Sequence, residues 1–153
     1  MSKSSLKTIL KMWSGLGYNN RAKRLYESSK LLAEQGFEGI YPNFEILPGV
    51  GSYTKNAILS FAYGDNVLAV DTNLQRIIIR YFGIDNTKDY LREYSDLLLE
   101  SIKSEDLNQA FMDFGSSICT SSNTKCDICP LEKNCKKYFV NSKNSIKKFK
   151  GSN

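Results

Sequence analysis

The sequence predicts an all-α protein, because apolar residues recur at helical spacing along most of its 153 residues. Six stripes follow the i, i+3, i+4, i+7 pattern that places side chains on one face of a helix. Alternation with a period of two residues is scarce, and the run 67–70 is better explained as a buried connector than as a strand. The stripes comprise Leu6, Ile9, Leu10 and Trp13; Ala22, Leu25, Tyr26, Ser29, Leu32 and Ala33; Ala57, Ile58, Phe61 and Ala62; Leu74, Ile77, Ile78 and Tyr81; Tyr90, Leu91, Tyr94, Leu97 and Leu98; and Leu107, Ala110, Phe111, Phe114 and Ile118.

Turns and capping residues separate these expected helices. Short segments that contain glycine or asparagine lie between the stripes, and both residue types favour tight turns. Thr87 and Ser104 stand where an N-cap is expected, and acidic residues follow each of them, as is favourable in a first helical turn. We expect residues 1–70 to form one helical lobe, residues 71–140 a second lobe, and residues 141–153 a basic tail.

The composition narrows the classes of protein to which the chain can belong. Apolar residues make up 41% of the sequence, and the net charge is +5 with an isoelectric point near 9.0. No apolar run reaches the ~18 residues of a transmembrane helix, and no signal peptide is recognisable, so we expect an intracellular, cytoplasmic protein. The basic C-terminal residues either form a solvated tail or contact a polyanion such as nucleic acid. Since histidine is absent, acid–base chemistry would fall to carboxylates, tyrosines, lysines or water.

All four cysteines lie in one short segment, CTSSNTKCDICPLEKNC. They are Cys119, Cys126, Cys129 and Cys135, with the spacing C-x6-C-x2-C-x5-C. Four thiolates this close in sequence can converge on one metal centre, since soft sulfur ligands suit zinc or an iron–sulfur cluster. The single close pair and the two longer steps fit a bulky cluster better than a zinc ion, whose structural sites usually have two close pairs. Disulfides or unrelated buried thiols are the alternatives, which an intracellular location disfavours.

The segment 47–54, LPGVGSYT, joins two helical patterns and predicts a tight hairpin. Gly49 and Gly51 flank Val50, and glycine accepts the positive φ angles that a tight hairpin needs. The hairpin leads into a helix N-terminus, whose backbone N–H groups can hold a phosphate, directly or through a bridging cation. Such a site would contact a nucleic-acid backbone rather than its bases. An ordinary turn between two helices is the alternative.

Asp71 follows the apolar run 67–70 and precedes the helix that is expected from Thr72. The simple interpretation is a helix N-cap. A carboxylate that is held at a helix end between buried elements can also stay ionised and stabilise an oxocarbenium ion at an anomeric carbon. The two interpretations are compatible, because one residue can cap a helix and face a cleft.

A second glycine-containing turn lies at 13–21 and carries Tyr18 at its tip, with Arg21, Lys23 and Arg24 at its end and just beyond. An exposed aromatic side chain on such a turn can wedge into a stack of bases. A tyrosine packed into the core is the alternative.

These segments and the cysteines together resemble the helix-hairpin-helix (HhH-GPD) DNA glycosylases that carry a [4Fe-4S] cluster, the endonuclease III superfamily. LPGVGSYT resembles the hairpin of the family, VDTN its catalytic aspartate motif, and the cysteine spacing its cluster signature. Tyr53 and Asp71 stand eighteen positions apart, as expected for the two active-site positions of the family. WSGLGYNNRAKRL and NQAFMDFGSSIC are most similar to the MutY-type adenine glycosylases within it.

The resemblance implies two helical lobes, one around the hairpin and one around the cluster, with a DNA groove between them. It implies that Asp71 and Tyr53 are catalytic, that the four cysteines hold a [4Fe-4S] cluster, and that a monovalent cation binds at the hairpin. The DNA contacts of the family fall on Tyr18, Leu47, Gly49, Val50, Gly51, Thr54 and Lys55.

The implied activity is hydrolysis of the N-glycosidic bond of a mispaired base in double-stranded DNA, most simply adenine opposite 8-oxoguanine or guanine. The enzyme would be monomeric and associated with the nucleoid. Bifunctional endonuclease III enzymes carry lysine where this chain has Tyr53, and without that amine no Schiff base forms. A monofunctional enzyme is therefore implied. A thymine or uracil glycosylase acting at G·T mismatches is the alternative, since thymine mismatch enzymes share the tyrosine.

The family's first helices have no counterpart in this sequence. In adenine glycosylases they carry a glutamate that protonates the leaving base and a glutamine wedge. The C-terminal domain that reads 8-oxoguanine has no counterpart either. We therefore expect an N-terminally truncated member of the family. A non-catalytic DNA-binding homologue and a zinc-binding helical protein are the remaining alternatives.

Overall fold

The computed structural model of the protein describes residues 1–84, 94–95 and 97–136. The described residues form no strand, which confirms the all-α prediction, and the segment 67–70 is a connector. Thr87, Tyr90 and Leu91, which we expected in a further helix, lie outside the described residues. The main helices are α1 (Leu6–Met12), α2 (Asn19–Ile40), α3 (Ser52–Ile58), α4 (Thr72–Phe82) and α6 (Ser104–Ser117). Shorter turns are a π-helical turn at Leu59–Tyr63 and 3-10 turns at Phe44–Ile46, Cys126–Ile128 and Glu132–Asn134.

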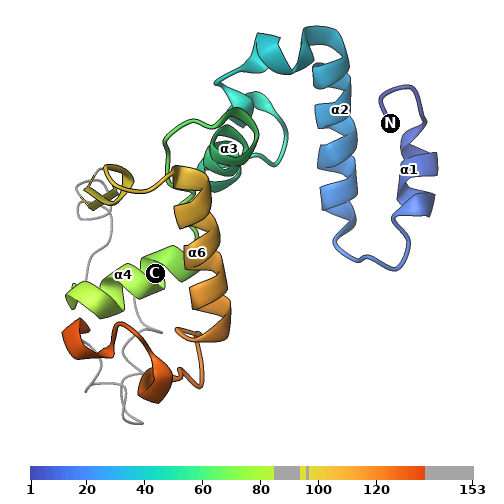
Figure 1. Cartoon of the computed structure of the whole chain (residues 1–153). Helices are drawn as coiled ribbons and strands as arrows, with labels where there is room; N and C mark the ends of the chain where they lie inside the picture. Colours follow the sequence, from blue (N-terminus) through green and yellow to red (C-terminus); the bar gives the residue numbers. More distant parts are fainter. Residues whose placement is uncertain (85–93, 96, 137–153) are drawn as a thin grey trace.

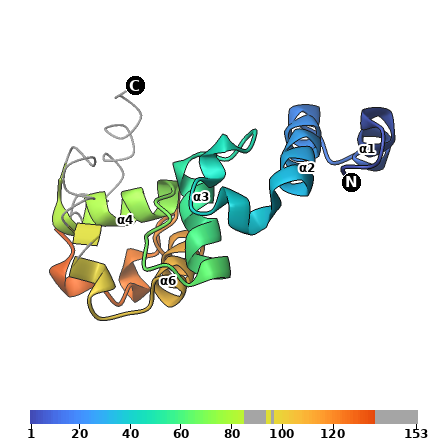
Figure 2. The same ribbon diagram turned by 90° about the horizontal axis from the view of Figure 1, so that it is seen from above.

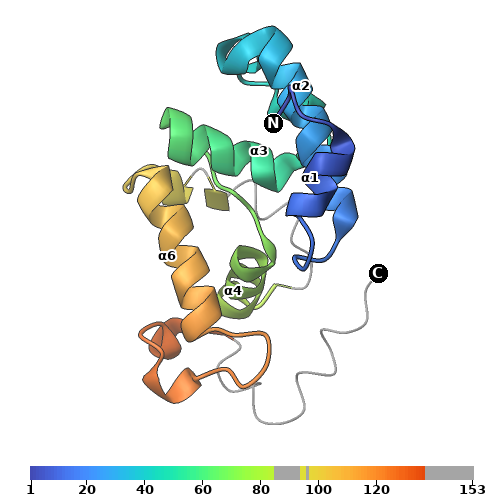
Figure 3. The same ribbon diagram turned by 90° about the vertical axis from the view of Figure 1, so that its right-hand side faces the viewer.

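The helices form two groups, with α3 between them (Figure 1). At one end of the molecule α1 and α2 run side by side, and at the other end α4 packs against α6. Figure 2 shows α3 between these two pairs in a second view. The cysteine-containing segment follows α6 and lies beyond its end, at the bottom of Figure 3. Within the described residues, no helix is long and apolar enough to cross a membrane.

Each group of helices has its own hydrophobic core, in agreement with the two predicted lobes. The connector at 67–70 passes between the cores, because Val67 packs against the first core while Leu68 and Val70 belong to the second. The division of the chain at residue 70 stays a prediction. The first core is built around Ile40, Phe44, Leu47 and Leu59, and the second around Leu68, Leu74, Ile78 and Leu107.

The first two helices are tied together at the start of the chain. Ser5 caps α1 by accepting a hydrogen bond from the backbone N–H of Thr8 at 3.1 Å. Tyr26 of α2 donates its hydroxyl to the backbone oxygen of Ser4 at 3.0 Å. Ile9 is buried as its stripe predicted, whereas Leu25 of the next stripe is exposed.

A π-helical turn changes the buried face of the helix that follows the hairpin. The sequence pattern predicted that Phe61 and Ala62 face the core. Both are exposed, and Leu59 and Ser60 are buried instead. A π turn accommodates more residues than an α turn and so rotates the following side chains around the helix axis. The predicted stripe is therefore wrong beyond Ile58, and a buried serine faces α6.

The start of α6 also differs from the prediction. Lys103 is the N-cap residue, and Ser104 is the first helical residue. Ser104 is buried and donates its hydroxyl to the backbone oxygen of Asp65 at 2.7 Å, so the hydroxyl makes a tertiary contact instead of a cap. Ala110, which we expected in the core, is exposed, and Asn108 is buried.

Candidate functional site

The hairpin at 47–54 forms a turn, but only one of its glycines needs a special conformation. The backbone N–H of Val50 donates to the oxygen of Leu47 at 3.0 Å. Gly49 has φ +87°, and a Cβ atom there would lie 2.8 Å from Cδ of Arg24. Gly51 has φ −98° and ψ −178°, and its Cβ would meet nothing within 4 Å. Of the two glycines, only Gly49 therefore uses the positive φ that glycine permits.

Replacing Gly49 with alanine should destabilise the protein by about 1–2 kcal/mol, because alanine at this φ is strained and crowds Arg24. Gly51→Ala is the matched control; alanine is a poorer N-cap than glycine but meets no strain or clash here, so its free energy of unfolding should fall by less than about 1 kcal/mol. Denaturant unfolding measures both. Equal losses for the two variants would contradict this account of the hairpin.

The other hairpin residues divide between the core and the surface. Leu47 is buried in the core of the first lobe, so only its backbone is available to a partner. Gly51 is the N-cap residue of α3, which places Tyr53 and Thr54 in the first turn of that helix. Lys55 forms an ion pair with Glu45, with Nζ and Oε2 3.0 Å apart. Tyr53 is partly exposed, and the amine of Lys55 is held at Glu45.

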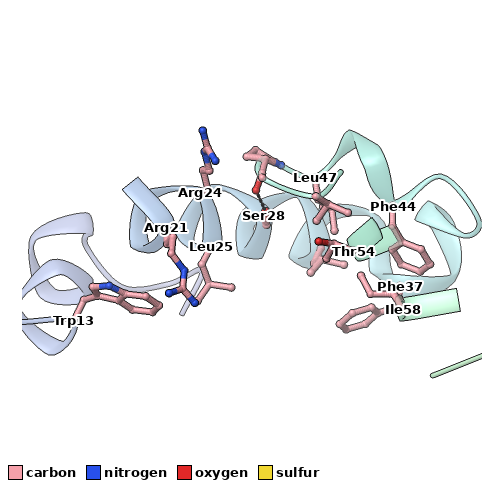
Figure 4. A pocket seen from close by; sticks show the side chains of 14 residues that line it. Trp13, Arg21, Arg24, Leu25, Ser28, Phe37, Phe44, Leu47, Thr54 and Ile58 are labelled. Carbon is pink, nitrogen blue, oxygen red and sulfur yellow. Dashed lines mark hydrogen bonds between the residues drawn. The ribbon is translucent and has the colours of Figure 1, made fainter. Parts of the chain in front are cut away.

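A cavity of about 430 Å³ lies between α2 and the hairpin (Figure 4). Its lining is mostly apolar, and the guanidinium of Arg21 lies over the ring of Trp13, 5.7 Å from its centre. Ser28 in its wall donates to the backbone oxygen of Pro48 at 3.2 Å. Trp13 and Arg21, which flank Tyr18 in the sequence, therefore line the same cavity as the hairpin residues Gly49 and Val50.

Tyr18 is exposed at the turn between α1 and α2. Its side chain is 83% exposed, and its backbone is left-handed, with φ 49° and ψ 58°. Gly15 and Gly17 also have positive φ and allow the turn. The alternative of a tyrosine packed into the core is therefore wrong, and the side chain is accessible to a partner.

Asp71 begins α4, and both of its carboxylate oxygens are engaged. Oδ1 accepts the backbone N–H of Leu74 at 2.8 Å, which makes Asp71 the N-cap. Oδ2 accepts the side-chain amide of Asn73 at 2.8 Å. The carboxylate is half-buried. These two bonds hold the orientation of the carboxylate at the N-terminus of α4.

A chain of hydrogen bonds connects Asp71 to the first cysteine. Asn73, which donates to Asp71, accepts from Nη2 of Arg76 at 2.8 Å. Arg76 also donates to the backbone oxygens of Gly115 and Cys119, both at 2.8 Å. Gly115 is required for this contact, because a Cβ there would lie 2.6 Å from Cβ of Asn73. The aspartate and the cysteine segment are therefore parts of one polar assembly.

The cysteine segment gathers its sulfur atoms next to α4. None of the four cysteines is in a disulfide, contrary to the disulfide alternative. Cys119, Cys129 and Cys135 line one small cavity of about 20 Å³. Burial raises the pKa of the Cys129 thiol, a backbone hydrogen bond from Leu131 lowers it, and the other three thiols raise it further. Among the described residues, no three histidine, cysteine or acidic side chains are arranged to hold a single metal ion.

Arg80 of α4 is buried and contacts the cysteine segment. Its Nη1 donates to the backbone oxygen of Thr120 at 2.7 Å, to Thr124 Oγ1 at 3.1 Å and to Cys119 Sγ at 3.4 Å. Cys135 donates its thiol to the backbone oxygen of Arg80 at 3.4 Å. The Nε of Arg80 is buried and lacks a hydrogen-bond partner within the described part of the chain. A buried donor beside the thiols of Cys119, Cys129 and Cys135 fits an iron–sulfur cluster, whose sulfur atoms accept hydrogen bonds.

Sequence reasoning missed the polar residues that support Asp71 and the cysteines. Arg76 and Arg80 of α4 are separated by one helical turn, and this spacing of two like charges is a signal that could have found them. Asn73 carries no such signal. Asn108 follows Leu107 on the buried face of α6, where the helical pattern would favour an apolar residue. A polar residue at such a position indicates a buried hydrogen bond.

The comparisons with known proteins agree with this geometry. A family model described as HhH-GPD superfamily base excision DNA repair protein matches residues 1–101. An adenine DNA glycosylase of Buchnera aphidicola subsp. Baizongia pistaciae is 43% identical over 149 residues, covering 92% of this chain and 42% of that protein. The human adenine DNA glycosylase is 32% identical over 147 residues, covering 89% of this chain and 27% of that protein. The chain thus spans less than half the length of these relatives.

Two solved structures are similar to this fold. The structure of a thermostable thymine-DNA glycosylase aligns with a TM-score of 0.78 and 32% identity, covering 91% of this chain and 68% of that one. A non-covalent endonuclease III–DNA complex aligns with a TM-score of 0.69 and 26% identity, covering 90% of this chain and 67% of that one. The family match covers more than half of the sequence, and the fold agrees with it. The chain belongs to the HhH-GPD superfamily of base excision DNA repair proteins.

Proposed function

We propose that this chain is a monofunctional DNA glycosylase that removes adenine opposite 8-oxoguanine or guanine. The observation that carries the proposal is the carboxylate of Asp71, which two hydrogen bonds hold at the start of α4 in the VDTN segment. The names of the curated relatives, adenine DNA glycosylases of bacteria and mammals, support adenine as the base. Double-stranded DNA containing the mismatch is the proposed partner.

In the proposed reaction the target nucleotide is flipped out of the duplex. The bond between C1′ and the base nitrogen breaks, and both electrons leave with the base, which takes up a proton. The carboxylate of Asp71 stabilises the oxocarbenium ion that develops at the sugar. Water then adds to C1′ and loses a proton, which leaves an abasic site. In this proposal Tyr53 faces the flipped nucleotide, and its hydroxyl cannot form an imine with the opened sugar.

The hairpin and Tyr18 have binding roles in this proposal. The backbone of the segment 49–51, with Thr54 and Lys55 in the helix that follows, contacts a DNA phosphate, aided by a monovalent cation. Leu47 supports the hairpin from the core. Tyr18, whose exposed ring stands at the turn before α2, fills the stack that the flipped base leaves.

The four cysteines, Cys119, Cys126, Cys129 and Cys135, hold a [4Fe-4S] cluster in this proposal. Their thiols and the buried donor of Arg80 fit such a group. The cluster supplies a covalent anchor for the C-terminal loop and no chemistry at the sugar. Arg76 connects that loop to the segment of Asp71, so order in the loop supports the orientation of the carboxylate.

A single-turnover assay on duplexes with A·8-oxoguanine, A·G and T·G pairs tests the proposal. We expect adenine to be released from the first two, and the product strand to stay intact until alkali is added. Release of thymine alone would favour the thymine glycosylase alternative, which the likeness to a thymine-DNA glycosylase structure supports. DNA binding without release of any base would favour a non-catalytic homologue.

Borohydride should trap little covalent complex on abasic DNA, because the amine of Lys55 is paired with Glu45 and Tyr53 has no amine. The measurement is the fraction of DNA that is shifted on a denaturing gel. Lys103→Ala, which removes an exposed lysine, is the control for Lys55→Ala. Efficient trapping that disappears only in Lys55→Ala would show a bifunctional enzyme.

A further inference from the structure

The connector that leads to Asp71 is neither helix nor strand, lies between the two cores, and has no strand beside it in the described part of the chain. Leu68 and Ala69 are buried within it. Buried backbone groups must find hydrogen-bond partners, because an unpaired one costs about 1–3 kcal/mol. Here side chains from other helices provide these partners.

Asn108 of α6 binds the connector at two points. Its Oδ1 accepts the backbone N–H of Ala69 at 2.9 Å, and its Nδ2 donates to the backbone oxygen of Val67 at 3.1 Å. The side chain is 2% exposed. The orientation of the amide is unambiguous, because the N–H of Ala69 can only donate and the oxygen of Val67 can only accept.

The second hydrogen of the Asn108 amide begins a directed chain of hydrogen bonds. Nδ2 also donates to Ser60 Oγ at 2.9 Å, and Ser60 and Ser104 hydroxyls are 2.9 Å apart. Ser104 donates its only hydroxyl hydrogen to the backbone oxygen of Asp65 at 2.7 Å, so Ser60 is the donor between the two serines. Bonds that point in one direction polarise and strengthen one another. This chain therefore also fixes the backbone of Asp65, two residues before the connector.

Asn56 of α3 holds the connector from the hairpin side. Its Nδ2 donates to the backbone oxygen of Leu68 at 2.8 Å. Asn56 lies three residues after Tyr53, so the two side chains are neighbours on the same helix. The connector is thus bound to the helix that carries Tyr53 and to α6, two residues before Asp71.

We propose that Asn108 and Asn56 are positioning residues, which hold the connector so that the carboxylate of Asp71 stands at a fixed place relative to Tyr53 and the hairpin. This inference rests on the proposed glycosylase function. Neither residue touches the base or the sugar in the proposal. Both act through the backbone of 67–70, and a displacement of about 1 Å at a catalytic group can slow a reaction about a hundredfold.

The test compares Asn108→Ser, whose side chain is too short to reach both backbone groups, with the milder Asn56→Leu at a half-buried position. We expect single-turnover excision to slow by about 10- to 100-fold in each variant, with duplex affinity changed by less than about threefold. Ile9→Val, which creates a small cavity at α1 outside the two cores that the connector contacts, is the control for lost stability.

Amide hydrogen exchange supplies a readout that does not depend on activity. The N–H of Ala69 should exchange faster in Asn108→Ser, while those of Ile77 and Ile78 in α4 keep their protection. Faster exchange throughout α4 and α6, or excision at the wild-type rate, would overturn the inference. If the wild-type chain releases no base, the proposed function fails. The positioning role in catalysis then fails with it, and the exchange data still decide whether Asn108 holds the connector.

Discussion

Replacing Asp71 with asparagine should slow adenine excision by at least about a thousandfold while leaving the fold intact. The two side chains have the same shape, and asparagine caps a helix about as well as aspartate does. The oxygen of an asparagine can still accept the N–H of Leu74, so α4 keeps its first turn. What is lost is the negative charge that stabilises the oxocarbenium ion. The measurements are single-turnover excision, duplex affinity and denaturant unfolding.

Asp65→Asn is the matched control for this variant. It makes the same chemical change near the start of the same connector, where the carboxylate accepts only the hydroxyl of Tyr41 at 3.1 Å among the described contacts. That hydrogen bond is the largest cause of the raised pKa of the Tyr41 hydroxyl, and desolvation of the hydroxyl raises the pKa further. The bond does not involve Asp71. Excision should stay within about threefold of the wild type. An unchanged rate in Asp71→Asn would leave Asp71 as a helix cap only.

The second large effect is expected at the cysteines. Protein that is purified without oxygen should contain about four iron and four sulfide per chain, as a four-cysteine cubane requires. Cys129→Ser should remove most of the iron, because one of the four thiolate ligands is lost. The cysteine segment is otherwise held by few hydrogen bonds to α4, chiefly those of Arg76 and Arg80. Without the cluster, the cysteine segment should lose order. The midpoint of thermal unfolding should then fall, and proteolysis within residues 119–135 should become faster.

Ser121→Ala, which changes an exposed residue of the same segment, is the control and should keep its iron. Iron and sulfide are measured chemically on the same samples as the unfolding curves. One zinc and no sulfide per chain would contradict the cluster, even if the variant loses stability. Full iron in Cys129→Ser would show that Cys129 is not a ligand.

Much of the fold and part of the site could be predicted because their causes are local. The helical stripes and the N-cap at Asp71 depend on residues within one or two turns of each other. The glycine-flexed turn at Tyr18 is local in the same way. Spacing alone also indicated that the cysteines share one site, and three of them line one cavity.

The failures of prediction have physical reasons that lie outside the local sequence. The π turn at 59–63 rotates Phe61 to the surface, and Ser104 uses its hydroxyl for a partner instead of a cap. Gly49 has the positive φ of the hairpin and lies against Arg24, whereas Gly51 has an ordinary negative φ. Each of these outcomes depends on which neighbour the fold supplies.

The sequence by itself therefore determined the helices, the position of Asp71 at a helix start and the grouping of the four cysteines in one segment. The tertiary structure decided which polar side chains support them. Asn108 meets Ala69 from 39 positions away in the chain, and Arg76 meets Cys119 from 43 positions away. No periodicity or spacing encodes such a pair. The buried backbone of the connector creates the need for a partner, and only the packing of α6 and α3 against it determines that Asn108 and Asn56 meet that need.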